Sequence, residues 1–203
     1  MKALLTILLV VVSLTTVLSI GFAYSGMYDV SAREGHWAPV DWLLQTTMRV
    51  SVEQRARNVE VPELTEQMKR AGVNDFEAMC VGCHGSPARP PGAMGQGLSP
   101  KAPDLSSSAQ RLRVSELFWI TKNGIRMTGM PAWGASHDPE EIWPVVAFMT
   151  ELPGLDETAY IDYLNAAQGL GHHQEQHLEA AQSPAETTTN VAQPAHDHST
   201  HQH

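Results

Sequence analysis

The two cysteines of this chain, Cys80 and Cys83, lie three positions apart and are followed directly by His84. Two thiols at this spacing can add to the two vinyl groups of one porphyrin, while the adjacent histidine presents a ring nitrogen to the iron. A bare Cys-x-x-Cys can instead be a redox-active dithiol or half of a zinc site. A dithiol of that kind belongs in a βαβ context, which is absent, and zinc would need two further ligands at compatible spacing. The motif predicts one covalently attached haem c.

An electron carrier also needs a sixth ligand for the iron, and a methionine thioether raises the reduction potential by favouring ferrous iron. Two residues compete for this role, Met127 and Met130. Met130 is preceded by Gly129, which lets the backbone approach a flat ligand, and followed by Pro131, which stiffens the loop. Either methionine could instead only fill the core, its commonest use. The sequence favours His84 and Met130 as the axial ligands.

Helices are expected to position these residues. Hydrophobic periodicity and capping signals predict helices at 63–79, 115–123 and 138–152, joined by a long loop at 85–113. Ser115 is the expected N-cap of the second helix. Asp138 and Glu141 form a capping box at the start of the third. A loop as long as 85–113 is expected to wrap around a bound group.

Taken together, these residues resemble a class I monohaem cytochrome c of the membrane-anchored, periplasmic bacterial type. The likeness rests on the Cys80–His84 motif, on Met130-Pro131-Ala132-Trp133 and on the closing helix, and it covers about residues 63–155. The resemblance implies an all-α fold around one haem, in which the first and last helices cross. It places Gly72 and Phe76 of the first helix opposite Trp143 and Phe148 of the last.

The resemblance also implies that a proline carbonyl accepts a hydrogen bond from the second ring nitrogen of His84 and orients the ring. Two prolines of the long loop are candidates, Pro100 and Pro103. The sequence does not choose between them.

The N-terminal segment 1–24 contains an uncharged run from Ala3 to Ala23, which as a helix is about 32 Å long and can cross a bilayer. Lys2 before it favours a cytoplasmic N-terminus and an exported remainder. A cleaved signal peptide is the alternative, since Gly21-Phe22-Ala23 offers small residues at a cleavage position. The apolar run is longer than a signal core, so we expect a retained, single-pass anchor in the bacterial inner membrane with the haem domain in the periplasm.

Segment 25–62 is predicted to contain a helix from Trp42 to Val59 with one apolar side, beginning after Pro39. This juxtamembrane helix could rest on the membrane interface. It could equally pack on the haem domain, which is predicted to span residues 63–163.

The final segment, 164–203, is polar and repetitive and carries seven of the ten histidines. It contains almost no large apolar residue, so no core can form from it and we expect a disordered tail. Its imidazoles could weakly chelate copper, nickel or zinc. They could equally do nothing specific. Metal handling linked to the haem is therefore the alternative function.

Charge and composition limit the partners. The formal net charge is −9, and no concentrated basic face is present, which excludes nucleic acid. Lys122 and Arg126 border the Met130 loop and could steer an acidic redox protein.

We expect an electron carrier rather than an enzyme, either free or as a subunit of a larger oxidoreductase complex. An open sixth position would instead indicate haem enzymology. The identity of the redox partners is not encoded.

Overall fold

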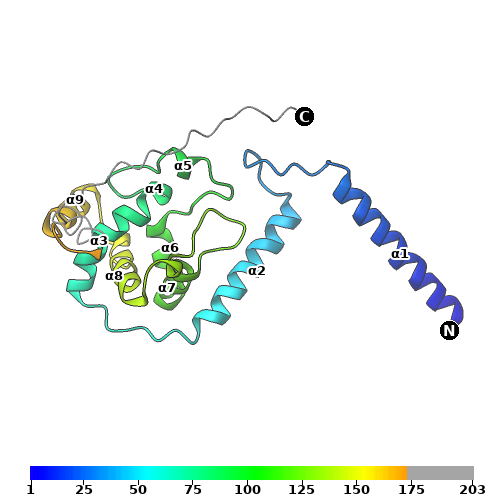
Figure 1. Ribbon diagram of the computed structural model, residues 1–203, viewed down its shortest axis with the longest axis horizontal. Helices are drawn as coiled ribbons and strands as arrows, with labels where there is room; N and C mark the ends of the chain where they lie inside the picture. Colours follow the sequence, from blue (N-terminus) through cyan, green and yellow to red (C-terminus); the bar gives the residue numbers. More distant parts are fainter. Residues whose placement is uncertain (173–203) are drawn as a thin grey trace, which may run out of the picture.

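The computed structural model describes residues 1–172. Every regular element in that range is a helix (Figure 1), which confirms the all-α prediction. The elements are α1 Lys2–Tyr24, α2 Ala38–Ala56, α3 Glu66–Met79, α4 Val81–His84, α5 Ala93–Gln96, α6 Leu105–Arg111, α7 Val114–Asn123, η1 Trp133–Ala135, α8 Pro139–Met149, η2 Leu152–Gly154 and α9 Glu157–Ala166.

The core forms where α3 crosses α8. Gly72 makes the close approach possible, because a Cβ at this position would lie 1.9 Å from the carbonyl oxygen of Pro144. Phe76 and Phe148 then meet edge to face at 5.3 Å between ring centroids. Both contacts confirm the crossing that the resemblance implied. Trp143, the other residue of α8 expected at the crossing, stacks on Phe118 of α7 at 3.9 Å between ring centroids.

Helix α7 lies beside α8 and begins one residue earlier than expected. Its N-cap is Arg113, whose backbone N–H donates to the Glu116 carboxylate at 2.7 Å, while the Arg113 guanidinium binds the same side chain at 2.9 Å. Ser115, the predicted N-cap, is a buried residue of the first turn. The reciprocal Arg113–Glu116 pairing satisfies the helix start that a serine side chain was expected to satisfy.

The predicted helix of the juxtamembrane segment is present as α2, shifted toward the N-terminus relative to the expected 42–59. Pro39 lies in its first turn, where a missing N–H costs no hydrogen bond. The C-terminal end of α2 buries Val52 and Ala56 and lies against α7. The sequence left open whether this helix rests on the membrane interface or packs on the haem domain, and its C-terminal end packs on the domain.

Helix α1 stands apart from the body of the molecule (Figure 1) and buries none of its side chains. Within residues 1–172 it is the one helix long and apolar enough to cross a membrane. This composition is compatible with single-pass anchoring.

Helix α9 packs on α3 behind the core. Tyr160 is fully buried, and its hydroxyl donates to Glu77 at 2.6 Å. The side-chain amide of Asn74 donates to the carbonyls of Ala167 at 2.5 Å and Leu170 at 2.7 Å. The domain division 1–24, 25–62, 63–163 and 164–203 stays a prediction, but α9 crosses its last boundary. The predicted tail after His172 lies outside the described residues.

Candidate haem site

In the Cys-x-x-Cys-His motif, Cys80 joins α3 to α4, and the remaining four residues form α4. Cys80 follows the last residue of α3, and its carbonyl accepts hydrogen bonds from the N–H groups of Cys83 at 3.1 Å and His84 at 2.9 Å. This turn gathers the two thiols and the imidazole into a single local unit. Cys80 is buried and Cys83 is half-buried, and both are free cysteines.

The His84 ring is oriented by the long loop. Its Nδ1 lies 2.8 Å from the carbonyl oxygen of Pro103. Because a carbonyl can only accept, Nδ1 must carry the proton, which leaves the Nε2 lone pair available to a metal. The structure thus selects Pro103 over Pro100, the choice that the sequence left open.

The thiols suit thioether bonds better than the alternative chemistries. Burial raises the pKa of the Cys80 thiol to about 12, and the neighbouring Cys83 and Asp75 add to this effect. A zinc site or a reactive dithiol depends on a thiolate, whereas a thioether is neutral. Within residues 1–172 there is also no group of three or more His, Cys, Asp or Glu side chains that could hold a metal ion. The residues present fit a porphyrin with pendant vinyl groups.

The long loop packs directly on the motif. The backbone N–H of Gly92 donates to the Gly82 carbonyl at 3.0 Å. Gly95 is buried, and a Cβ there would lie 2.5 Å from the Cys83 carbonyl oxygen. The predicted loop 85–113 is therefore not structureless, because α5 and α6 lie within it and hold the chain against the motif.

The two candidate methionines lie in different surroundings. Met130 is half-buried, and its backbone is fixed on both sides, with its N–H donating to Thr128 Oγ1 at 3.1 Å and its carbonyl accepting from Ile125 at 3.3 Å. Met127 is 79% exposed at the tip of the same turn. It also has a positive φ of 61°, which is rare for a side chain of this size.

Gly124 allows the Met130 turn to close. Its φ is +65°, and a Cβ there would lie 2.7 Å from the Met130 carbonyl oxygen. Gly129 touches the side chain of Leu98 in the long loop, so this turn meets the loop that also carries Pro103. The tertiary fold thus places both candidate-ligand segments against one connecting loop.

The predicted basic rim is only partly available. The Lys122 ammonium lies 5.9 Å from the centroid of the Phe118 ring, and its aliphatic chain lies against Gly134. Arg126 is exposed, in the same turn as Met127.

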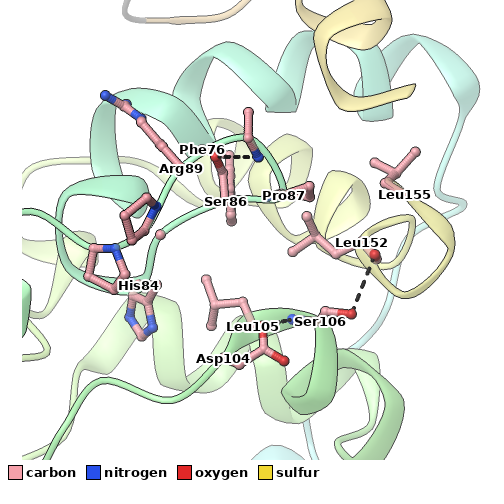
Figure 2. A pocket seen from close by; sticks show the side chains of 14 residues that line it. Phe76, His84, Ser86, Pro87, Arg89, Asp104, Leu105, Ser106, Leu152 and Leu155 are labelled. Carbon is pink, nitrogen blue, oxygen red and sulfur yellow. Dashed lines mark hydrogen bonds between the residues drawn. The ribbon is translucent and has the colours of Figure 1, made fainter. Parts of the chain in front are cut away.

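A cavity of about 440 Å³ lies behind His84, between the chain at 84–91, the start of α6 and η2 (Figure 2). Leu105, Leu152 and Leu155 line it together with Phe76, and the Ser106 hydroxyl donates to the Leu152 carbonyl across its edge at 3.4 Å. Neither cysteine nor Met130 is among its lining residues. Of the proposed haem-binding residues, only His84 lines it.

Comparison with known families identifies this region. Residues 67–149 match the family model described as cytochrome c oxidase, cbb3-type, subunit III. These residues form a class I monohaem c-type cytochrome domain. The domain binds haem c and supports haem-based electron transfer. The match covers less than half of the chain and contains the motif, the Met130 turn and the α3–α8 crossing. No match was found among curated proteins or among solved structures.

Some contributors to the cytochrome domain were not found from the sequence. Gly95 and Gly124 are required by close approaches that depend on which loops meet, and glycine alone did not signal this. Asn74 and Tyr160 tie α9 to α3 beyond the matched region.

Proposed function

We propose that this cytochrome domain carries single electrons between redox proteins at the outer face of the bacterial inner membrane. Cys80 and Cys83 hold the haem through thioether bonds, and His84 and Met130 are the axial ligands. The observation that carries this assignment is the Nδ1 bond from His84 to Pro103, which leaves Nε2 free for iron within the attachment turn. The domain is a free carrier or a subunit of a larger oxidoreductase complex.

Met130 is proposed over Met127 because it is half-buried and anchored through both backbone groups. Met127 points out of the turn at 79% exposure, so ligation by Met127 would require the turn to be rebuilt. With both axial positions filled by protein side chains, no site is left on the iron for a substrate. Electron transfer, rather than substrate turnover, is the chemistry that such a site supports.

The proposed location follows from α1. Its 23 residues span about 35 Å as a helix, enough for the hydrocarbon core of a bilayer. Lys2 is the one charged residue before the apolar run and favours the cytoplasm, which supports a periplasmic location for the cytochrome domain. Metal handling by the histidine-rich tail has no support from the described residues. The Nδ1 atom of His172, the first of these histidines, lies 2.7 Å from the Glu141 carboxylate.

The decisive test compares Met130→Ala with Met127→Ala. Met130→Ala should abolish the near-infrared band typical of ferric iron with a methionine ligand, and carbon monoxide should bind the ferrous protein. The reduction potential should fall, because the thioether that favours ferrous iron has been removed. Met127→Ala should change none of these properties. Ready binding of carbon monoxide by the unaltered protein would refute the electron-carrier proposal, and an open spectrum only in Met127→Ala would reassign the ligand.

A further inference from the structure

Helix α2 has two apolar faces, and the cytochrome domain covers only one of them. Val52 and Ala56, four residues apart, are 3% and 1% exposed against α7. Toward the N-terminus the same side of the helix continues through the polar residues Gln45 and Arg49, seven residues before Val52 and Ala56, and through Trp42, which is 67% exposed beside them. The contact with the domain therefore ends after the last two turns.

The opposite side of α2 is apolar and exposed. Leu43 and Val50 lie seven residues apart on this side, with Thr47 between them, and Leu44 flanks them. Leu43, Leu44 and Val50 are 57%, 39% and 43% exposed. We call these four residues the outer stripe. Because the outer stripe points away from the face that packs on α7, no element of the cytochrome domain can cover it while that packing holds.

The start of α2 is tied to the outer end of α1. Trp37, the N-cap of α2, contacts Phe22 of the last turn of α1, with ring centroids 6.0 Å apart. Tyr28 fills the corner between them, 5.1 Å from Trp37, and its hydroxyl lies 2.6 Å from His36 Nδ1. From this corner α2 runs off to the side instead of continuing the axis of α1 (Figure 1).

We propose that the outer stripe of α2 lies on the lipid surface of the membrane that α1 spans. The inference rests on the proposed membrane anchor. Lipid is the occupant favoured by the structure, because the aromatic corner fixes the first turn of α2 at the end of the apolar anchor. Tryptophan and tyrosine at this position are typical of the membrane–water boundary. A helix lying in that boundary buries its apolar side in lipid and keeps polar residues such as Gln45 and Arg49 toward water.

In this arrangement α2 links the membrane to the cytochrome domain. The outer stripe binds lipid, while Val52 and Ala56 bind α7, and the Arg113 guanidinium donates to the Glu53 carbonyl at 3.4 Å. Helix α7 ends at Gly124, where the Met130 turn begins. Helix α2 thus fixes the orientation of the haem site and its distance from the bilayer, which suits a redox partner within the same membrane.

Single cysteines can test this inference in the full haem-loaded protein, because its own two cysteines are expected to be bonded to the haem. Leu43→Cys and Thr47→Cys report on the outer stripe, and Gln45→Cys and Arg49→Cys are matched controls on the other side of the same turns. Each variant is placed in vesicles of phosphatidylethanolamine and phosphatidylglycerol that contain a photoactivatable diazirine phospholipid. The readouts are the rate of alkylation by a water-soluble maleimide and the lipid adducts found by mass spectrometry.

The expected result is alkylation several-fold slower at 43 and 47 than at 45 and 49, with lipid adducts on the α2 peptide. Equal, fast alkylation at all four positions would overturn the inference. Slow alkylation at 43 and 47 that disappears when protein is diluted in lipid, without adducts, would also overturn it, because a second copy would then cover the stripe. Val12→Cys monitors α1 independently: fast alkylation there, or a mature chain that starts after α1, would refute the anchor itself.

Discussion

The two sides of the proposed haem site are built differently. On the His84 side, the attachment turn continues a core helix, Cys80 is 5% exposed, and the Pro103 carbonyl fixes the imidazole. On the Met130 side, the proposed ligand lies in a surface turn held by two hydrogen bonds of its backbone, and the neighbouring Met127 is 79% exposed. This difference indicates that packing of the core fixes the conformation of the histidine side, whereas the turn on the methionine side can change its conformation without unfolding the domain. Substitutions on the His84 side should therefore affect retention of the haem, whereas substitutions on the Met130 side should affect only its ligation.

The largest expected effect is on the His84 side. Replacement of both thiols, Cys80→Ala with Cys83→Ala, should abolish covalent haem entirely, because no other cysteine is present to form a thioether. Mass spectrometry and acid-acetone extraction of protein matured in a host with haem c assembly would measure this. Haem that resists extraction from the double variant would contradict the attachment site.

On the Met130 side, Gly124→Ala should weaken ligation while covalent haem is kept. The residue has φ +65°, and a Cβ would lie 2.7 Å from the Met130 carbonyl, so the turn must open. A side chain forced into this region costs about 3 kcal/mol of folding stability at most. The near-infrared band should be lost at a lower temperature or milder pH than in the unaltered protein.

Gly82→Ala is the matched control, since no atom lies within 4 Å of its Cβ position between the two cysteines. It should leave the spectrum and stability essentially unchanged. If Gly82→Ala weakened ligation as much as Gly124→Ala does, the proposed difference between the His84 side and the Met130 side would be contradicted.

Helix α9 and the residues after it pack on α3 behind the His84 side, and truncation should show that they stabilise the domain. A chain that ends after Leu164 lacks Ala167 and Leu170, which accept hydrogen bonds from the buried Asn74 side chain. Loss of these partners should lower the free energy of unfolding by about 2 kcal/mol. A chain that ends after His172 should be as stable as the full chain.

Both truncated proteins should keep the visible spectrum, because neither cut reaches a proposed ligand. Thermal and denaturant unfolding measure the stability, and absorbance measures the haem site. Equal stability of the two chains would show that residues 165–172 do not stabilise the domain.

The smallest expected effect concerns Tyr160, whose hydroxyl binds Glu77 behind α3. Burial first, and then this carboxylate, raise the pKa of Tyr160 far above its ordinary value of 10.0. A raised pKa means that the neutral form is favoured in the folded state. The resulting stability is therefore present below about pH 10 and is lost as the pH rises above it.

Tyr160→Phe should lower the free energy of unfolding by about 1 kcal/mol at neutral pH through the lost hydrogen bond. It should also lose less stability than the unaltered protein above pH 10. Tyr24→Phe, at an exposed position outside the domain, is the control. An unchanged alkaline profile in Tyr160→Phe would contradict the role of this hydroxyl.

The sequence by itself determined what is local. Cys80, Cys83 and His84 are close because one helical turn brings them together, and Asp138 with Glu141 caps α8 because both groups lie in its first turn. The pair Gly72 and Phe76 was also accessible, since the resemblance implied a helix crossing that a small residue must permit. Local geometry of this kind depends on few neighbours, so residue types and spacing suffice.

Only the tertiary structure decided which distant groups meet. It selected Pro103 over Pro100, replaced Ser115 by Arg113 as the N-cap of α7, and brought residues 164–172 onto α3. It also showed that α2 packs on the domain near its C-terminal end and leaves the outer stripe exposed on its opposite side. Each of these outcomes depends on the direction in which a loop returns, and that direction is set by packing across the whole core rather than by the residues of the loop.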